Sequence, residues 1–191
     1  SRGDVPLLRA LAAHVIGTQY PEVGEANEEG VVRFFKILTA RTARLIARWM
    51  ALGFVHGVMN TDNLSILGLT IDYGPYGWLD VFDPDFTPNT TDYQQGRYRW
   101  RQQPAVGHWN LARLARALAP LVGDSARLDA VVAEYPEHYS AAWRTELSAK
   151  LGFAIQPGDD DFVMEMFGAL GASETDWTLF FRGLANVPRT G

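Results

Sequence analysis

Four polar side chains with a regular spacing are the residues best suited to chemistry in this sequence. Asn63 follows His56 by seven positions, Asp62 directly precedes Asn63, and Asp72 follows Asn63 by nine positions. Amide and carboxylate oxygens are hard ligands of the kind that Mg²⁺ prefers. A divalent ion held by both would neutralise phosphate oxygens, so the pattern predicts chemistry on a nucleotide.

The order of these residues is similar to that of the catalytic elements of protein kinases. Kinases carry a His-x-Asp-x-x-x-x-Asn loop followed by an Asp-x-Gly, and His56, Asn63 and Asp72 occupy three of those places. Val58 stands where kinases have the catalytic aspartate. Asp62 is the carboxylate inside the loop, so it could accept a proton or assist metal binding. Turn formation alone is the other explanation for Asp and Asn in such a segment.

Helices are expected on both sides of this segment. Apolar residues recur at intervals of three and four through 5–16 and 31–50, and Gly53 is expected to end the second helix. Further helices are predicted from Trp109 or Asn110 onward, over 125–151 with a break at Pro136, over 159–170 and over 174–184. The residues expected to face inward on the last two are Phe162, Met166, Phe167, Leu170, Trp177, Phe180, Phe181 and Leu184.

The intervening segment has a different character. Residues 64–71 predict two very short strands joined at Gly68, which would fix the separation of Asn63 and Asp72. Residues 80–104 lack any period and predict a long ordered loop. The fold class is therefore mainly α, one domain with a short β-hairpin at the metal site.

The run Gly53–Asp80, GFVHGVMNTDNLSILGLTIDYGPYGWLD, resembles the signature of the selenoprotein O family of kinase-fold protein adenylyltransferases. Further matches are Asp83-Pro84, Gly96-Arg97-Tyr98, Gln103-Pro104, Trp109-Asn110-Leu111 and Arg41-Thr42-Ala43. The resemblance implies that residues 1–191 are the helical C-lobe of a protein-kinase-like fold. It also implies transfer of AMP from ATP to Ser, Thr or Tyr hydroxyls of proteins, with Mg²⁺, or Mn²⁺ in its place.

The resemblance also implies a role for each candidate residue. Asp62 would be the proton acceptor, Asn63 a magnesium ligand, and Asp72 a magnesium ligand that also contacts ATP. The family's glycine-rich loop, its Lys–Glu ion pair and its phosphate-binding arginines precede the matched region. With Ser1 at the start instead of Met, we expect a fragment that lacks the N-lobe and is inactive by itself. A complete protein that has lost its methionine is the alternative.

Two other functions stay open at this stage. One is a kinase-like enzyme that transfers the γ-phosphate, and the other is a non-catalytic pseudokinase scaffold. Both would keep the helical lobe, but the scaffold would not need Asp62, Asn63 and Asp72 together.

The composition of the chain limits the classes of molecule that it could bind. The 191 residues are 47% hydrophobic, contain no cysteine and carry a net charge of −5, which excludes a disulfide framework and opposes binding to nucleic acid or anionic membranes. No run approaches the roughly 20 apolar residues of a membrane helix, and no signal peptide is recognisable. We expect a bacterial, cytoplasmic protein whose partners are ATP, hydroxyl-bearing proteins and an N-lobe of the same polypeptide.

Several other polar residues need an interpretation. His56 is expected to hold the loop through a backbone hydrogen bond and not to bind metal. The carboxylates of Asp80, Asp83 and Asp85 are expected to serve in turns and caps. The arginines Arg97, Arg99 and Arg101 would either meet the substrate at the mouth of the site or form ion pairs within the loop.

Overall fold

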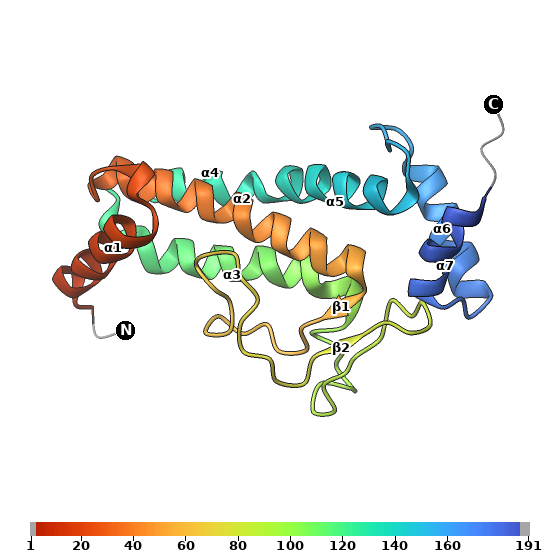
Figure 1. The fold of residues 1–191 in the computed structure, drawn as a ribbon. Coiled ribbons are helices and arrows are strands. Elements are labelled where there is room, and N and C mark those ends of the chain that lie inside the picture. The colour runs from red at the N-terminus through yellow and green to blue at the C-terminus, as the bar shows by residue number, and fades with distance from the viewer. Residues whose placement is uncertain (1–2, 188–191) are drawn as a thin grey trace.

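Three long helices form the body of the molecule in the computed structural model, which describes residues 3–187 (Figure 1). They are α2 (Glu28–Leu52), α3 (Gln103–Leu118) and α5 (Tyr135–Leu151), and α2 packs against both of the others. The segment between α2 and α3 lies along one side of this body. None of the described helices is long and apolar enough to cross a membrane.

Helix α2 follows directly from its sequence. The Asn27 side chain accepts a hydrogen bond from the Gly30 amide and caps the start of the helix. Gly53 adopts a left-handed conformation with φ of 73° and ends it, as predicted. A side chain at this position would collide with the ring of Trp177 at 2.8 Å, so both the backbone and the packing require glycine.

One end of the body holds the first hydrophobic core. Helix α1 (Val5–Gln19), capped by Asp4, is followed by the short helix η1 (Pro21–Val23) and packs against α2. Helix α4 (Ala126–Ala133) covers α2 and α3. The break predicted near Pro136 is confirmed, because α4 ends at Ala133 and α5 begins at Tyr135 with the proline in its first turn.

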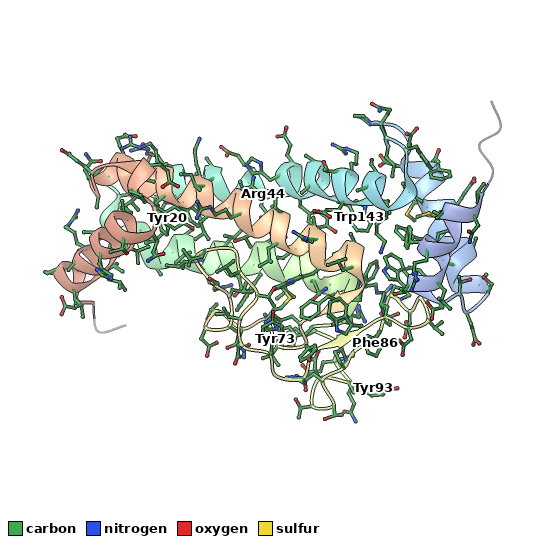
Figure 2. All side chains as sticks on the ribbon, viewed as in Figure 1. Tyr20, Arg44, Tyr73, Phe86, Tyr93 and Trp143 are labelled. Atoms are coloured by element: carbon green, nitrogen blue, oxygen red, sulfur yellow. The ribbon has the colours of Figure 1, made fainter. Side chains whose placement is uncertain are left out.

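The opposite end holds a second, aromatic core. Helices α6 (Asp160–Ala172) and α7 (Trp177–Gly183), followed by η4 (Leu184–Asn186), surround the fully buried Trp177. Figure 2 shows Tyr20 near one end of the body and Trp143 toward the other. The prediction that Phe162 faces inward is wrong. Its side chain is 45% exposed, and its ring meets that of Phe153 edge-on.

Helix α3 begins at Gln103, six or seven residues earlier than the sequence pattern indicated. The single turn η2 (Trp100–Gln102) runs into α3 at Gln103, and η3 (Ala119–Leu121) follows its end. Pro104 lies in the first turn of α3, where its missing amide costs no hydrogen bond. The start was missed because the buried face of this turn carries the polar side chain of Gln103 instead of an apolar one.

The strands predicted within 64–71 do not form. The two-stranded antiparallel sheet consists instead of β1 (Phe54–Val55) and β2 (Gly77–Trp78), which lie on either side of that segment. Ile66 and Leu67 pack against the first core, and the Tyr20 hydroxyl donates to the Ile66 carbonyl. Ile66 and Leu67 are therefore partly buried against helices instead of pairing in a hairpin, since such burial removes more apolar surface from water than an isolated hairpin would.

Candidate functional site

The ring of His56 joins the two candidate segments. This residue directly follows β1 and is only 1% exposed. Its Nε2 lies 2.8 Å from the Ile71 carbonyl oxygen, and its Nδ1 lies 3.4 Å from the Val58 amide nitrogen. A carbonyl can only accept, so Nε2 carries the hydrogen and Nδ1 accepts from Val58. Both nitrogens are thus engaged with backbone, which confirms that His56 holds the loop and is not free to bind metal.

The side chain of Gln103 fixes His56 to helix α3. Its Oε1 accepts from the His56 amide at 3.0 Å, and its Nε2 donates to the Phe54 carbonyl at 2.8 Å. Gln103 is fully buried, so these groups have no water to replace the lost partners. The sequence singled out Gln103 only as part of a matching dipeptide. Its anchoring role depends on a contact 47 residues away in the chain.

Gly57 brings the loop after β1 against the turn that follows Asp72. It has a positive φ of 80°, and a Cβ there would lie 2.2 Å from the Pro75 carbonyl oxygen. Only glycine permits both the conformation and the approach. Asn89 completes this contact, because its Nδ2 donates to the Gly57 carbonyl at 3.0 Å from a buried position. Nothing in the local sequence around Asn89 indicated this role.

Asn63 is held with its amide oxygen free. Its Nδ2 donates to the Val58 carbonyl at 3.2 Å, and its backbone amide donates to the Asn60 carbonyl at 3.0 Å. The side chain is half-buried. Among residues 3–187 its Oδ1 takes part in no hydrogen bond, so this oxygen could serve as a ligand.

Asp72 directly follows Ile71, whose carbonyl is bound by His56, and its backbone conformation is unusual. Its φ is 55°, in the left-handed region that non-glycine residues rarely adopt and that Asp tolerates better than most. Its carbonyl accepts from the Gly74 amide at 2.8 Å, which closes a tight turn. The side chain is exposed. Such conformations are concentrated at functional sites, where the surrounding structure maintains them.

Asp62 lies at the surface of the loop. Its side chain is exposed, and within residues 3–187 its carboxylate takes part in no hydrogen bond or ion pair. A carboxylate that is not neutralised by a neighbour is free to accept a proton from an incoming hydroxyl group.

The donor set suits a magnesium ion that keeps several other ligands. Across the described part of the chain no three His, Asp or Glu side chains gather into a metal site. The candidate ligands are one amide oxygen, from Asn63, and one carboxylate, from Asp72. Mg²⁺ commonly takes one or two protein oxygens and completes its shell with water and phosphate, so these residues fit that ion.

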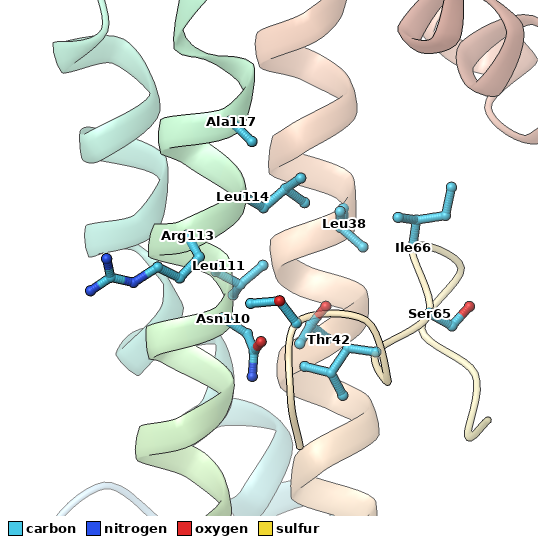
Figure 3. Close-up of a pocket in the computed structure, with 11 residues that line it drawn as sticks. Leu38, Thr42, Ser65, Ile66, Asn110, Leu111, Arg113, Leu114 and Ala117 are labelled. Carbon is cyan, nitrogen blue, oxygen red and sulfur yellow. The ribbon is translucent and has the colours of Figure 1, made fainter. Parts of the chain in front are cut away.

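The loop after β1 and the segment before Asp72 are connected through hydrogen bonds of the His56 ring to backbone atoms. No hydrogen bond links the side chains of Asn63 and Asp72. Thr61 and Leu64, which flank Asp62 and Asn63, line a cavity against α2 and α3 (Figure 3). Tyr73, which follows Asp72, lines a different groove. The carboxylates of Asp62 and Asp72 are thus exposed, and Asn63 is half-buried beside the cavity that Leu64 lines.

Two further buried side chains, Asn110 and Asp92, support the loop that carries Asp62 and Asn63. Asn110 of α3 donates from Nδ2 to the Met59 carbonyl at 2.9 Å. Asp92 accepts from the amides of Arg97 and Tyr98, and the Tyr98 hydroxyl then donates to the Asn60 side chain at 2.6 Å. Long polar loops that pack in this way are ordered by their own side chains.

The structure shows ion pairs within the loop for two of the three arginines. Asp85 pairs with Arg99 at 3.2 Å and with Arg101 at 2.8 Å, so these two stabilise the loop. The guanidinium of Arg97 instead lies 4.7 Å above the ring of Trp109 and is exposed. The turn role predicted for Asp83 is confirmed, since its carboxylate accepts from the Asp85 amide.

Comparison with known proteins shows which family the chain is similar to. The profile of the family described as protein adenylyltransferase SelO matches residues 2–190. The chain is 53% identical over 190 residues to the protein nucleotidyltransferase YdiU of Xylella fastidiosa (strain 9a5c), covering 97% of this chain and 36% of that protein. It is 51% identical over 186 residues to YdiU of Nitrosospira multiformis, covering 95% and 33% respectively.

A third relative, YdiU of Xanthomonas campestris pv. campestris (strain B100), is 48% identical over 188 residues, which are 98% of this chain and 36% of that protein. The chain therefore spans about a third of the length of the curated relatives it matches. Because the family profile covers almost every residue, the chain belongs to the SelO family of protein adenylyltransferases, whose curated relatives are named protein nucleotidyltransferase YdiU.

Proposed function

We propose that this chain is the helical C-lobe of a kinase-like fold and carries the catalytic loop of an enzyme that transfers AMP from ATP to protein hydroxyl groups. One observation carries the proposal: the buried ring of His56 binds the backbone on both sides of the site, at Val58 and Ile71. Phosphate-transfer chemistry depends mainly on positioning and electrostatics. A buried ring that ties the loop carrying Asp62 and Asn63 to the segment preceding Asp72 serves that need.

Mg²⁺ is the ion that we propose, with Mn²⁺ as its substitute. The free Oδ1 of Asn63 and the exposed carboxylate of Asp72 would hold it, and Asp72 would also face the ATP phosphates. When bound, the ion offsets the negative charge that develops on the phosphate oxygens. The support is the oxygen-only donor set and the orientation of Asn63, whose Nδ2 is tied to Val58.

Asp62 is the proposed proton acceptor. The hydroxyl oxygen of a substrate Ser, Thr or Tyr forms a bond to the α-phosphorus, and the bond from that phosphorus to the bridging oxygen of the β-phosphate breaks. Pyrophosphate leaves with that bonding pair, and the hydroxyl proton passes to the Asp62 carboxylate. Val58 stands where an ordinary kinase has its aspartate, so Asp62 is the carboxylate available inside the loop.

The remaining clamps on ATP are proposed to come from outside these 191 residues. The chain matches about a third of the length of its relatives, and we propose that the glycine-rich loop, lysine, glutamate and arginines lie in another part of the fold. We therefore propose that the isolated chain is inactive and works with an N-lobe. Since the reaction consumes ATP and acts on proteins, we propose the bacterial cytoplasm as its location.

A chimera tests the function directly. The matching third of the Xylella fastidiosa relative is replaced by this chain, and the product is incubated with protein substrates and ATP labelled at the α- or the γ-phosphate. The expected result is α-label on protein, lost at least about 100-fold in Asp62→Ala, Asn63→Ala and Asp72→Ala. Asp161→Ala is the control, because Asp161 lies exposed on α6 far along the chain from the site.

Each outcome selects one function. Transfer of γ-label instead of α-label would establish the kinase alternative. A folded chimera that binds no Mg-ATP would favour the non-catalytic scaffold. Full activity in Asp72→Ala would overturn the metal and nucleotide role assigned to that residue.

A further inference from the structure

Two arginine side chains share one tryptophan ring beside the loop that carries the proposed catalytic residues. The guanidinium carbon of Arg97 lies 4.7 Å from the centre of the Trp109 ring, and that of Arg113 lies 4.9 Å from it. All three side chains are exposed. Two cations on one ring are no more than about 10 Å apart, roughly one Debye length at 0.1 M salt, so solvent ions do not fully screen their repulsion.

No carboxylate neutralises this pair of arginines within residues 3–187. In that part of the chain neither guanidinium group takes part in an ion pair or a hydrogen bond. The carboxylate of Asp85 is already shared by Arg99 and Arg101. The carboxylate of Asp92 is buried and accepts two backbone amides. An anion from outside would therefore offset a repulsion that the described residues leave in place.

The sequence around the pair is unusual in its charge. Residues 93–123 contain five arginines and no Asp or Glu, whereas the whole chain has 22 acidic and 17 basic residues. In a chain with a net charge of −5, such a stretch produces a local field of the opposite sign. A field of this kind attracts ligands of complementary charge, so the pair favours an anionic partner.

The Trp109 ring prepares both guanidinium groups for such a partner. A guanidinium group that lies over an aromatic ring keeps the N–H groups at its edge free to donate to a carboxylate. Because the ring already restricts the long arginine side chains, less conformational freedom is lost on binding. Arg97 and Trp109 also line an open hollow of about 400 Å³, which leaves room for side chains of a peptide.

The pair adjoins the loop on the side that leads into the proposed proton acceptor. The hydroxyl of Tyr98, the residue after Arg97, donates to the Asn60 side chain at 2.6 Å. Arg113 and Thr61 line the same cavity, although the Arg113 side chain points away from the other labelled residues (Figure 3). An acidic side chain bound by the pair would therefore bring a neighbouring hydroxyl group to this part of the loop.

The proposed nucleotide contact has different surroundings. Tyr73, which follows Asp72, lines a groove whose lining includes neither arginine of the pair. The pair is thus better placed for the protein that supplies the hydroxyl group than for the phosphates of ATP.

We propose that Arg97, Arg113 and Trp109 form a docking surface for an acidic segment of the protein substrate, next to its reactive hydroxyl group. That the acidic segment belongs to a substrate rests on the proposed function, whereas its binding to the chain does not. The surface would favour Ser, Thr or Tyr residues that are flanked by Asp or Glu, because guanidinium groups pair with carboxylates.

Two fluorescently labelled peptides that differ only in charge test the docking surface on the 191-residue chain. The acidic peptide is Gly-Glu-Glu-Ser-Glu-Glu-Gly, the neutral peptide has Gln in place of each Glu, and binding is followed by fluorescence anisotropy. The acidic peptide is expected to bind at least about tenfold more tightly. This difference should shrink between about 50 and about 300 mM salt, because salt screens exposed ion pairs.

Substitutions locate the binding. Arg97→Gln and Arg113→Gln are each expected to weaken binding of the acidic peptide about threefold, and together about tenfold. Trp109→Leu keeps both charges but removes the ring that holds them, and should also weaken binding about threefold. Arg9→Gln is the matched control, because it removes one exposed charge from α1 and should bind normally. Circular dichroism checks that each variant folds.

Several results would overturn the docking surface. They are equal binding of the two peptides, no binding of the acidic peptide up to about 1 mM, and undiminished binding by the folded double arginine variant. Displacement of the peptide by Mg-ATP would assign the arginines to the nucleotide instead. Tighter binding of oligouridylate than of the acidic peptide would make the surface a nucleic-acid site.

The chimera described above tests the link to the substrate. With the two peptides as acceptors, transfer of α-label should favour the acidic one at least about fivefold at low peptide concentration, and the double arginine variant should lose that preference. Transfer without any preference would overturn the substrate role of the surface. A chimera that binds the acidic peptide but transfers no label would contradict the proposed function and leave the peptide-binding surface supported.

Discussion

The buried support of the loop and its reactive edge are built on opposite principles. His56, Gln103 and Asn89 are buried, and the side chain of each donates to or accepts from backbone of another segment. Asp62 and Asp72 are exposed, and their carboxylates are left without a protein partner among the described residues. The difference shows that precision at this site comes from the buried layer, while the groups proposed to do chemistry are left free.

This contrast predicts the largest loss of stability in the buried layer. Gln103→Ala would leave the His56 amide and the Phe54 carbonyl without partners in the interior. The expected cost in the free energy of unfolding is about 3 kcal/mol, measured by urea denaturation. Gln102→Ala, at the neighbouring half-buried position, should cost less than about 0.5 kcal/mol. Equal losses in the two variants would contradict the anchoring role of Gln103.

The second largest loss of stability is expected where Gly57 contacts the turn that follows Asp72. Gly57→Ala puts a methyl group 2.2 Å from the Pro75 carbonyl and forces alanine into a left-handed conformation. We expect a loss of about 2 kcal/mol with shifted amide resonances on both segments. Gly74→Ala is the control, because a Cβ there meets nothing within 4 Å. Shifts confined to one segment would show that the two are not in contact.

Replacing His56 should reduce stability less than the two changes above, and it should loosen the turn at Asp72. His56→Phe keeps a buried aromatic ring but removes the bonds to Ile71 and Val58. The expected loss is about 1 to 2 kcal/mol, with faster hydrogen exchange of the Gly74 amide. His108→Phe is the matched control, since His108 stacks on Tyr135 away from the loop. If the Gly74 amide exchanges at the same rate in His56→Phe, His56 does not hold Asp72 in position.

The reactive edge should show the smallest effect on stability. Asp62→Asn and Asp72→Asn remove charges that are exposed and unpaired, so each is expected to change the free energy of unfolding by no more than about 0.5 kcal/mol. Thermal or urea unfolding of the 191-residue chain measures this. A loss above about 2 kcal/mol in either variant would mean that the carboxylate supports the fold, as the turn interpretation of these residues holds.

Sequence patterns were reliable where the information is local. The cap at Gly53, the break at Pro136 and the order of His56, Asn63 and Asp72 depend on neighbouring residues, and the structure bears out the first two directly. Family membership, inferred from the Gly53–Asp80 run, was likewise confirmed. The roles of Asp62, Asn63 and Asp72 in catalysis remain predictions.

The sequence by itself thus determined the helices, the end of α2 at Gly53, the family and the candidate residues, because propensity, capping and motif spacing act over a few positions. Only the tertiary structure decided that Ile66 and Leu67 pack against the first core, that β1 pairs with β2, and that Gln103 and Asn89 hold the loop. Each of these outcomes depends on whether a segment packs better against one part of the molecule than against another part that is distant in the sequence. That competition is a property of the whole packed chain, and no local window contains both competitors.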